Sequence, residues 1–267
     1  MSDIKIAFDR AYAAIAILFL MMAQGSLAEE DDSLYQISTI GALMQGVYDG
    51  TMTFGELGER GDFGLGTVQA LDGEMVAVDG QFYQVKSDGV AYSLSDSMIT
   101  PFSVVTFFDA EETINLGGRY NLSELQGYLD NSLESDNLFY AIRIDGTFDY
   151  VKTRSVPAQE KPYPPLEEAI KGQEIFEFHD VEGTVVGFRC PDYVEGVNVP
   201  GYHLHFITLD RKAGGHLLDL ELEDASAKVD SISGFEMDLP ENKQFYQADL
   251  SDSQEEELER IESNPRE

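Results

Sequence analysis

The sequence predicts an α+β protein in which β-strands predominate, built from two β units. Asp-Gly pairs stand between short apolar runs at 72–73, 79–80, 88–89 and 145–146, and this pair is a strong hairpin signal. Helical apolar periodicity is confined to a few short segments. Residues 157–165 hold four of the nine prolines, which indicates a stiff linker between the two units.

Composition excludes several classes of partner. The 267 residues include 50 acidic and 17 basic side chains, for a formal net charge of −33. Nucleic acid and anionic membrane surfaces are therefore not expected as partners, because both require clustered Lys and Arg. The apolar content of 43% is typical of a folded globular protein. The single cysteine, Cys190, cannot form an internal disulfide and is expected to be an inert core thiol.

The first 28 residues resemble a secretory signal peptide. Lys5 and Arg10 precede an apolar run at 11–23, and the small-x-small sequence ending at Ala28 follows. This order predicts cleavage after Ala28 and export to the periplasm or the medium, with no membrane attachment afterwards. The run is short for a membrane span, but two aspartates weaken the basic start, so an uncleaved anchor or a buried helix remains the alternative.

The first β unit, over 29–160, contains most of the expected helices. In order, we expect a strand at 34–40, short helices at 41–48 and 53–59, strands at 63–71 and 74–78 in an antiparallel meander ending near 95, a strand at 101–108 and a helix at 121–129. Thr53 and Glu56 have the spacing of a capping box. Asn121 is a good N-cap for the last helix. A hairpin turn is expected at 145–146, with Arg154 on its return strand.

The second β unit, over 161–267, carries a histidine hairpin. A short helix at 166–172 and strands at 174–178 and 183–189 precede it. His203, His205 and His216 are three of the four histidines in the chain. On a strand, the first two project to one face, roughly 7 Å apart. If the turn centres on Asp210-Arg211, His216 lies opposite His205, about 5 Å away.

Three converging imidazoles with one open position are typical of a catalytic zinc site. The alternative is three unrelated histidines on a sheet, and a register slip of one residue would send His216 to the other face. His179 lies outside the cluster and is expected to be an ordinary, partly exposed residue.

Several segments, in this order, carry a resemblance to a known family. They are Asp62-Phe-Gly-Leu-Gly-Thr67, Leu71-Asp-Gly-Glu74, Thr153-Arg154, Asn198-Val-Pro-Gly-Tyr-His-Leu-His-Phe206 and Gly214-Gly-His-Leu-Leu-Asp219. From about residue 34 to the C-terminus the chain resembles the alpha-acetolactate decarboxylases. The resemblance implies two β-rich lobes: a mixed-sheet N-terminal lobe and a smaller antiparallel C-terminal lobe, with the metal site between them.

The resemblance also implies the reaction and the residues that perform it. The expected reaction is zinc-dependent decarboxylation of 2-acetolactate to acetoin and CO₂, through a metal-stabilised enediolate that is protonated on one face. Zinc would be bound by His203, His205 and His216. The catalytic group would comprise Glu74, Arg154 and Glu262, and the substrate would contact Arg154 and Thr67. A homodimer is a further expectation.

Each of these assignments has a simpler alternative. Glu74 follows an Asp-Gly turn, where an exposed glutamate is ordinary, and Arg154 could form a structural ion pair on so acidic a protein. Glu262 ends an acidic helix at 255–262 that is typical of solvated surface. Two other functions remain open on the residues alone. One is a cupin-like oxygenase, and the other is an exported metal- or solute-binding β protein without catalysis.

Overall fold

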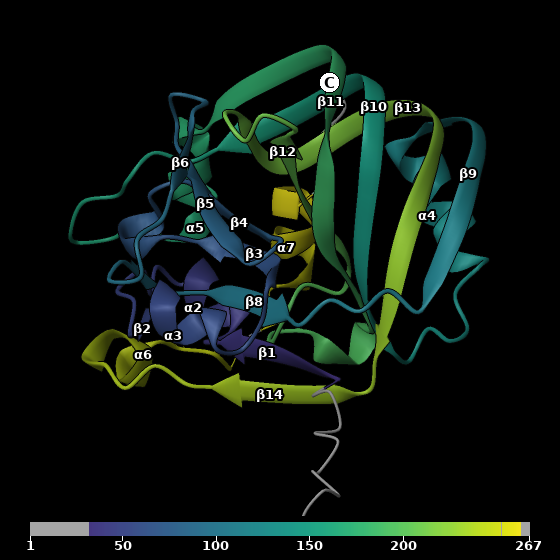
Figure 1. Cartoon of the computed structure of the whole chain (residues 1–267). Helices are drawn as coiled ribbons and strands as arrows, with labels where there is room; N and C mark the ends of the chain where they lie inside the picture. The colour runs from purple at the N-terminus through teal and green to yellow at the C-terminus, as the bar shows by residue number, and fades with distance from the viewer. Residues whose placement is uncertain (1–31, 252, 263–267) are drawn as a thin grey trace, which may run out of the picture. The chain divides into compact units, whose positions relative to one another are not determined.

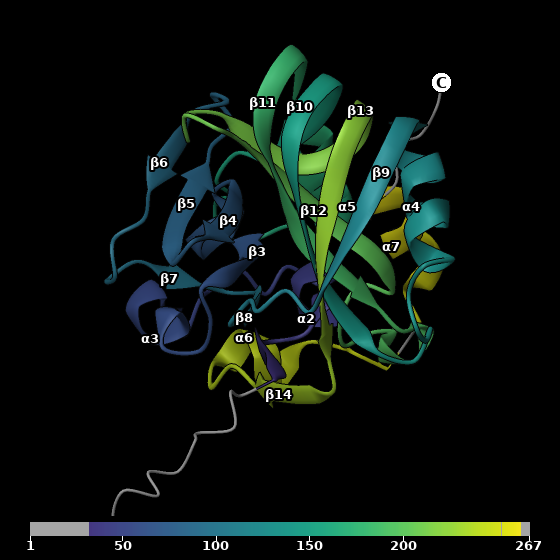
Figure 2. The same cartoon turned by 45° about the vertical axis from the view of Figure 1, so that its right-hand side comes forward.

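The computed structural model describes residues 32–251 and 253–262. The expected signal peptide, 1–28, lies outside the described residues. Within those ranges, no helix is both long and apolar enough to cross a membrane. Two β-sheets dominate the fold (Figures 1 and 2). One sheet is mixed and the other is antiparallel, as expected for a β-rich α+β protein.

The mixed sheet has seven strands in the order β14-β1-β8-β3-β4-β5-β6. These are β1 (Ser33–Ile37), β3 (Phe63–Thr67), β4 (Glu74–Val78), β5 (Gln81–Val85), β6 (Ala91–Ser93), β8 (Ser103–Thr106) and β14 (Gly234–Asp238). Among the described strands of this sheet, only β1 and β14 pair in parallel. Because β14 lies late in the chain, the C-terminal part of the sequence completes a sheet that the N-terminal part begins.

The antiparallel sheet has five strands in the order β10-β11-β12-β13-β9. These are β9 (Glu112–Asn121), β10 (Phe139–Ser155), β11 (Glu174–Cys190), β12 (Gly201–Thr208) and β13 (Gly214–Ile232). β10 also pairs directly with β13, so four strands form a closed circuit of hydrogen-bonded neighbours. β9 and β10 precede residue 160, so the two sheets do not divide the chain at the proline-rich stretch.

Short helices and one small β pair connect the strands. The pair is β2 (Met52–Thr53) with β7 (Ile99–Thr100), and the α-helices are α2 (Ile40–Met44), α3 (Phe54–Gly58), α4 (Leu122–Asp130), α5 (Leu166–Ala169), α6 (Lys243–Gln247) and α7 (Glu255–Glu262). In the described part of the chain, three 3-10 helices lie at Gln69–Leu71, Ile170–Gly172 and Asp192–Val194. The expected capping box of Thr53 with Glu56 is present. The expected N-cap at Asn121 is also present, and Glu124 completes a second capping box there.

The hairpin predicted at Asp79-Gly80 is confirmed. Both residues have positive φ, 53° and 71°, and Val78 pairs with Gln81 across the turn, the arrangement expected of a two-residue hairpin.

The turn predicted at Asp145-Gly146 is wrong, because β10 runs through it without interruption. Gly146 pairs with Gly183, and the Asp145 carboxylate accepts hydrogen bonds from Arg143 and Thr184. Pairing with β11 and β13 on either side thus overrides the local turn preference. For the same reason, the two strands expected at 174–178 and 183–189 form the single strand β11.

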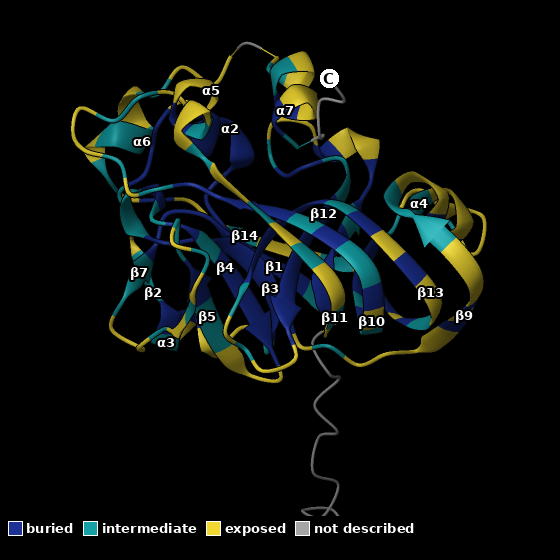
Figure 3. Ribbon diagram, turned by 90° about the horizontal axis from the view of Figure 1, so that it is seen from above, coloured by how far each residue is buried: buried dark blue, intermediate teal, exposed yellow. Residues whose placement is uncertain are grey.

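The main hydrophobic core lies between the two sheets. It combines Phe63 of β3 with Phe188 of β11 and Ile232 of β13, and it includes Leu258 and Ile261 of α7. A second cluster joins α4 to the antiparallel sheet. Figure 3 shows the buried residues gathered along β1, β3 and β4. The cavity lined by the three histidines adjoins the main core, since Leu43, Phe102 and Val156 belong to both.

Candidate metal centre

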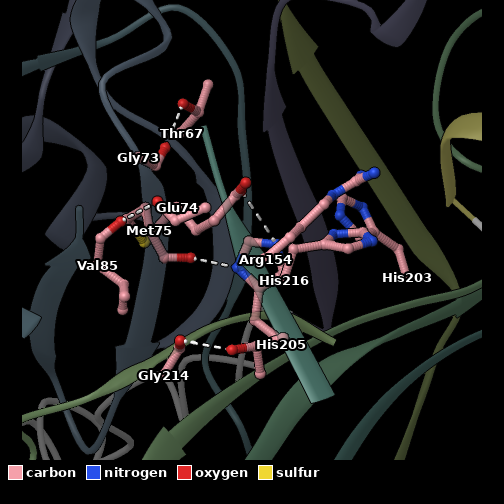
Figure 4. Close-up of polar contacts among 12 residues, drawn as sticks. Thr67, Gly73, Glu74, Met75, Val85, Arg154, His203, His205, Gly214 and His216 are labelled. Atoms are coloured by element: carbon pink, nitrogen blue, oxygen red, sulfur yellow. Dashed lines mark hydrogen bonds and ion pairs between the residues drawn. The ribbon is translucent and has the colours of Figure 1, made fainter. Parts of the chain in front are cut away.

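Three buried histidines converge where β12 meets β13. His205 pairs directly with His216, which is the register expected from the hairpin, and the turn spans 209–213. The rings of His203, His205 and His216 lie 5.2–5.3 Å apart, centroid to centroid. One nitrogen from each ring lies within 4.8 Å of the others. Figure 4 shows the three rings side by side.

The surroundings keep these imidazoles neutral. Burial, together with the positive charge of the nearby Arg154 guanidinium, lowers the pKa of His203 to about 3. Burial is also the main reason that the pKa values of His205 and His216 lie well below the ordinary range. A neutral imidazole has one nitrogen with a free lone pair, which is the form that binds a metal.

A hydrogen bond orients His205. Its Nδ1 lies 2.8 Å from the backbone oxygen of Met75, so Nδ1 carries the proton and donates it to that carbonyl. The other nitrogen, Nε2, is then an acceptor, and it is buried without a hydrogen-bond partner. A backbone carbonyl that fixes the tautomer of a histidine is a common feature of metal sites.

Arg154 joins the histidine strands to the end of α7. It lies in β10 opposite His216 and is 6% exposed. Its Nη1 donates to the backbone oxygen of Ile261, and its Nη2 lies 3.8 Å from Oε1 of Glu262. Its Nε is buried with no hydrogen-bond partner.

Glu262 reaches the histidines from α7. Its Oε2 lies 3.5 Å from Nε2 of His216 and 3.8 Å from Nε2 of His203. The helix is placed by Leu258 and Ile261, which are buried in the main core. The exposed acidic surface expected of this helix is formed by Glu255, Glu256 and Glu259, whereas Glu262 faces inward.

Glu74 reaches the histidines from the opposite sheet. Its Oε2 lies 3.7 Å from Nε2 of His205, and its side chain is 13% exposed. The strand expected at 63–71 ends at Thr67, and Ala70, Leu71 and Gly73 then take positive φ values. This tight connection brings Glu74 to the first position of β4, so an exposed location after the Asp-Gly turn is wrong.

Both carboxyl groups hold protons near neutral pH. Burial raises the pKa of Glu262 to about 7, although Arg154 opposes the shift. Burial also raises the pKa of Glu74 to about 7; Arg154 lowers it, and the charge of Glu262 raises it slightly. A carboxyl with a pKa near 7 is suited to proton transfer at physiological pH.

Thr67 lies at the same cavity, but its hydroxyl has a backbone partner. Thr67 Oγ1 donates to the backbone oxygen of Gly73, 2.7 Å away. The hydroxyl hydrogen is therefore used in the hydrogen bond to the turn that precedes Glu74. Only the lone pairs of the hydroxyl oxygen can accept a hydrogen bond from another molecule.

The histidines, Arg154, Thr67 and both glutamates enclose a cavity of about 40 Å³. Its apolar wall is formed by Ile40, Leu43, Leu71, Phe102, Leu166 and Ile170. A larger hollow of about 480 Å³ is lined by Leu258 and Glu262 among others. Glu262 therefore lies between the two spaces.

Two other candidates from the sequence lie apart from the cavity. His179 is exposed and its ring stands 5.3 Å from that of Tyr150. Cys190 is a buried free thiol, and burial raises its pKa to about 12, which is consistent with an inert core thiol. The carbonyl partners Met75 and Ile261 were not foreseen, since backbone groups leave no pattern in a sequence.

Comparison with known proteins identifies relatives along most of the chain. Residues 34–252 match the family model described as alpha-acetolactate decarboxylase. An alpha-acetolactate decarboxylase of Methanosarcina mazei is 56% identical over 86% of this chain and 80% of its own length. One of Methylococcus capsulatus is 48% identical over 89% of this chain and 91% of its own.

A solved structure agrees with these matches. The crystal structure of alpha-acetolactate decarboxylase from Bacillus subtilis strain 168 has a TM-score of 0.85 and 42% identity, covering 87% of this chain and 100% of that one. The range matched by the family model includes the three histidines, Glu74 and Arg154, whereas Glu262 lies beyond it.

Proposed function

Because this chain belongs to the alpha-acetolactate decarboxylase family and is a carboxy-lyase, we propose that it decarboxylates 2-acetolactate with a zinc ion bound by His203, His205 and His216. The products are acetoin and CO₂. Family membership favours this reaction over a cupin-like oxygenase and over binding without catalysis.

The observation that carries the zinc proposal is the convergence of three neutral, buried imidazoles. Their nitrogen atoms lie within 4.8 Å of one another, and Nε2 of His205 is buried without a partner. Three nitrogen ligands with room for a fourth ligand suit catalytic zinc. When bound, zinc supplies a Lewis acid that stabilises negative charge on the substrate oxygens as CO₂ leaves.

Arg154 is the group we assign to the substrate carboxylate. A guanidinium presents a planar fork of donors that matches a carboxylate. Two of its nitrogens are directed at the end of α7, while the buried Nε has no partner. A carboxylate beside Arg154 would be held next to the histidines, because Arg154 lies opposite His216 in the sheet.

We assign proton transfer to Glu74 and Glu262. Loss of CO₂ leaves an electron pair that is delocalised onto the neighbouring ketone of the substrate as an enediolate, and one carbon must then receive a proton. Both carboxyls have pKa values of about 7, so each can hold that proton at neutral pH. They approach the histidines from different elements, β4 and α7. A donor fixed on one side of the substrate would give acetoin of a single configuration.

Acetoin release tests this function. Purified protein should convert racemic 2-acetolactate to acetoin rapidly, lose the activity after chelation, and regain it when zinc is restored. Oxygen uptake during the assay would point to the oxygenase instead. A folded, metal-loaded sample that releases no acetoin would contradict the decarboxylase proposal.

We also propose that residues 1–28 direct export and that the mature protein is a homodimer. The order of basic, apolar and small residues at the N-terminus supports the first proposal, and the family resemblance supports the second. Mass spectrometry of protein from the periplasm or medium should give a chain that starts at Glu29. Light scattering should give twice the mass of one chain.

A further inference from the structure

Hydrogen bonds that cross from one sheet to the other surround Glu74. The residue before it, Gly73, donates its backbone N–H to the oxygen of Val156, 2.9 Å away. The residue after it, Met75, accepts a hydrogen bond from Nδ1 of His205. Glu74 belongs to the mixed sheet, whereas Val156 follows β10 and His205 lies in β12. The residues on both sides of Glu74 are therefore hydrogen-bonded to residues of the antiparallel sheet or directly after it.

A third crossing bond starts from a side chain. Ser155, directly after Arg154, donates its hydroxyl to the backbone oxygen of Val85, 2.8 Å away. Val85 is the strand partner of Glu74 in β5. Figure 4 shows Val85 beside Glu74 and Met75, with the dashed bond that ends on Val85.

The turn before β4 lies very close to the end of β5. A Cβ atom added to Gly73 would lie 2.2 Å from the oxygen of Val85, and Gly73 has a positive φ of 83°. Only glycine fits there without displacement. The Val85 oxygen thus contacts both Gly73, in the turn before Glu74, and the hydroxyl of Ser155. A shift of this oxygen would therefore displace the backbone next to Glu74.

We propose that Ser155 is a positioning residue for proton transfer, whose hydroxyl fixes Glu74 relative to Arg154 and the histidines. The proposal rests on the function assigned to Glu74 above. Ser155 has 0% exposure and is not among the residues that line the histidine cavity. It acts through Val85 and does not contact the substrate. The preceding hydroxyl, Thr153, donates instead to Gly214 of β13 and stays within the antiparallel sheet.

The first experiment removes this hydroxyl. Ser155→Ala should lower kcat about 10- to 100-fold, since small displacements of a reacting group cost rates of this order. KM should stay within about two-fold, because Glu74 is not assigned to substrate binding. Ser155→Thr, which keeps the hydroxyl, should restore most of kcat. The absorption spectrum of protein loaded with Co²⁺ should be unchanged, since the histidines keep their geometry.

Thr106→Val is the matched control. Thr106 is 1% exposed, and its hydroxyl donates to the backbone oxygen of Ser33, within the mixed sheet. This variant also loses one buried hydroxyl bond to a carbonyl, so it should lose stability with little change in kcat. An equal loss of kcat in Thr106→Val and Ser155→Ala would overturn the proposal, because a general loss of stability would then explain both.

A double-mutant cycle with Glu74→Gln separates positioning from other effects. If Ser155 acts through Glu74, then adding Ser155→Ala to Glu74→Gln should lower kcat by less than about two-fold further. An undiminished further loss would contradict the proposal, as would full kcat in Ser155→Ala or failure of Ser155→Thr to restore it. If Ser155→Ala does not fold, then Ser155→Cys, a weaker donor of similar size, should give an intermediate kcat, and full kcat in that variant would contradict the proposal.

Failure of the proposed function would look different. Wild-type protein would then release no acetoin from 2-acetolactate, whatever the state of Ser155. Active wild-type protein with an equally active Ser155→Ala variant would refute the positioning role alone.

Discussion

Nη2 of Arg154 and Oε1 of Glu262 lie 3.8 Å apart at the centre of the site, although one residue belongs to β10 and the other ends α7. The contact is reinforced by Nη1 of Arg154, which donates to the backbone oxygen of Ile261, 107 residues further along the chain. The C-terminal helix is thereby tied to the strand that faces His216. The last described turn of the chain therefore contacts both Arg154 and the histidines.

Glu262→Gln should lower kcat by about 10²- to 10⁴-fold, the range typical of a lost general acid or base. The amide has nearly the same shape but cannot deliver a proton. Acetoin release under saturating 2-acetolactate measures kcat, and metal analysis should show that zinc is retained. Glu256→Gln, an exposed position on the same helix, is the control and should keep full activity.

Arg154→Lys should lower kcat/KM by about 100-fold, chiefly through a higher KM, because one ammonium cannot replace a planar fork that serves both α7 and a carboxylate. Initial rates over a range of 2-acetolactate concentrations separate the two constants. Arg119→Lys is the control, since Arg119 makes ion pairs at the surface and is 62% exposed. Unchanged KM in the Arg154 variant would show that the substrate carboxylate is bound elsewhere.

Sequence patterns predicted those features that depend only on residues close together in the chain. His205 and His216 face each other because the length of the turn sets the register of a hairpin, and length can be counted in a sequence. The helix caps at Thr53 and Asn121 formed for the same reason, since the four residues from N-cap to N3 contain the whole motif. The type of both sheets could also be anticipated from the family resemblance.

The features that the sequence did not predict depend on contacts between residues far apart in the chain. Asp145-Gly146 has the composition of a turn, but the strands on both sides hold it extended. Glu262 has the sequence context of a solvated helix, and only the burial of Leu258 and Ile261 turns it inward. Ser155 shows no distinguishing pattern, because its partner Val85 is 70 residues away.

His205→Ala should abolish tight metal binding and activity together. Two imidazoles remain, and a catalytic zinc site normally requires three protein ligands. Metal content should be measured after dialysis at about 0.15 M salt, because the net charge of −33 attracts divalent cations that salt screens. His179→Ala is the matched control and should retain one metal per chain. A His205 variant that keeps both metal and activity would refute the three-histidine site.

The free energy of unfolding of metal-free protein should fall as pH rises from about 4.5 to 7, because of the raised pKa values of Glu74 and Glu262. The folded pKa of each carboxyl is about 7 against an ordinary value of 4.5. In this window the folded state keeps protons that the unfolded chain has already released, so the free energy of unfolding falls as pH rises. Each group contributes up to about 1.4 kcal/mol per pH unit. Melting of chelated Glu74→Gln and wild-type protein at several pH values measures the effect, and the variant should gain stability relative to wild type as pH rises. A constant difference would contradict the raised pKa.

Ending the chain after Asp252 should abolish turnover while leaving a folded but less stable protein. The truncation removes Glu262 and also the Ile261 carbonyl that receives the Arg154 hydrogen bond, so activity should fall at least as far as in Glu262→Gln. It also exposes core surface previously covered by Leu258 and Ile261, and burial of such side chains stabilises by about 1.5–3 kcal/mol each. Circular dichroism should therefore show a native spectrum with a lower Tm. If the folded truncate keeps full activity, Glu262 has no part in the mechanism and Glu74 must supply the proton alone.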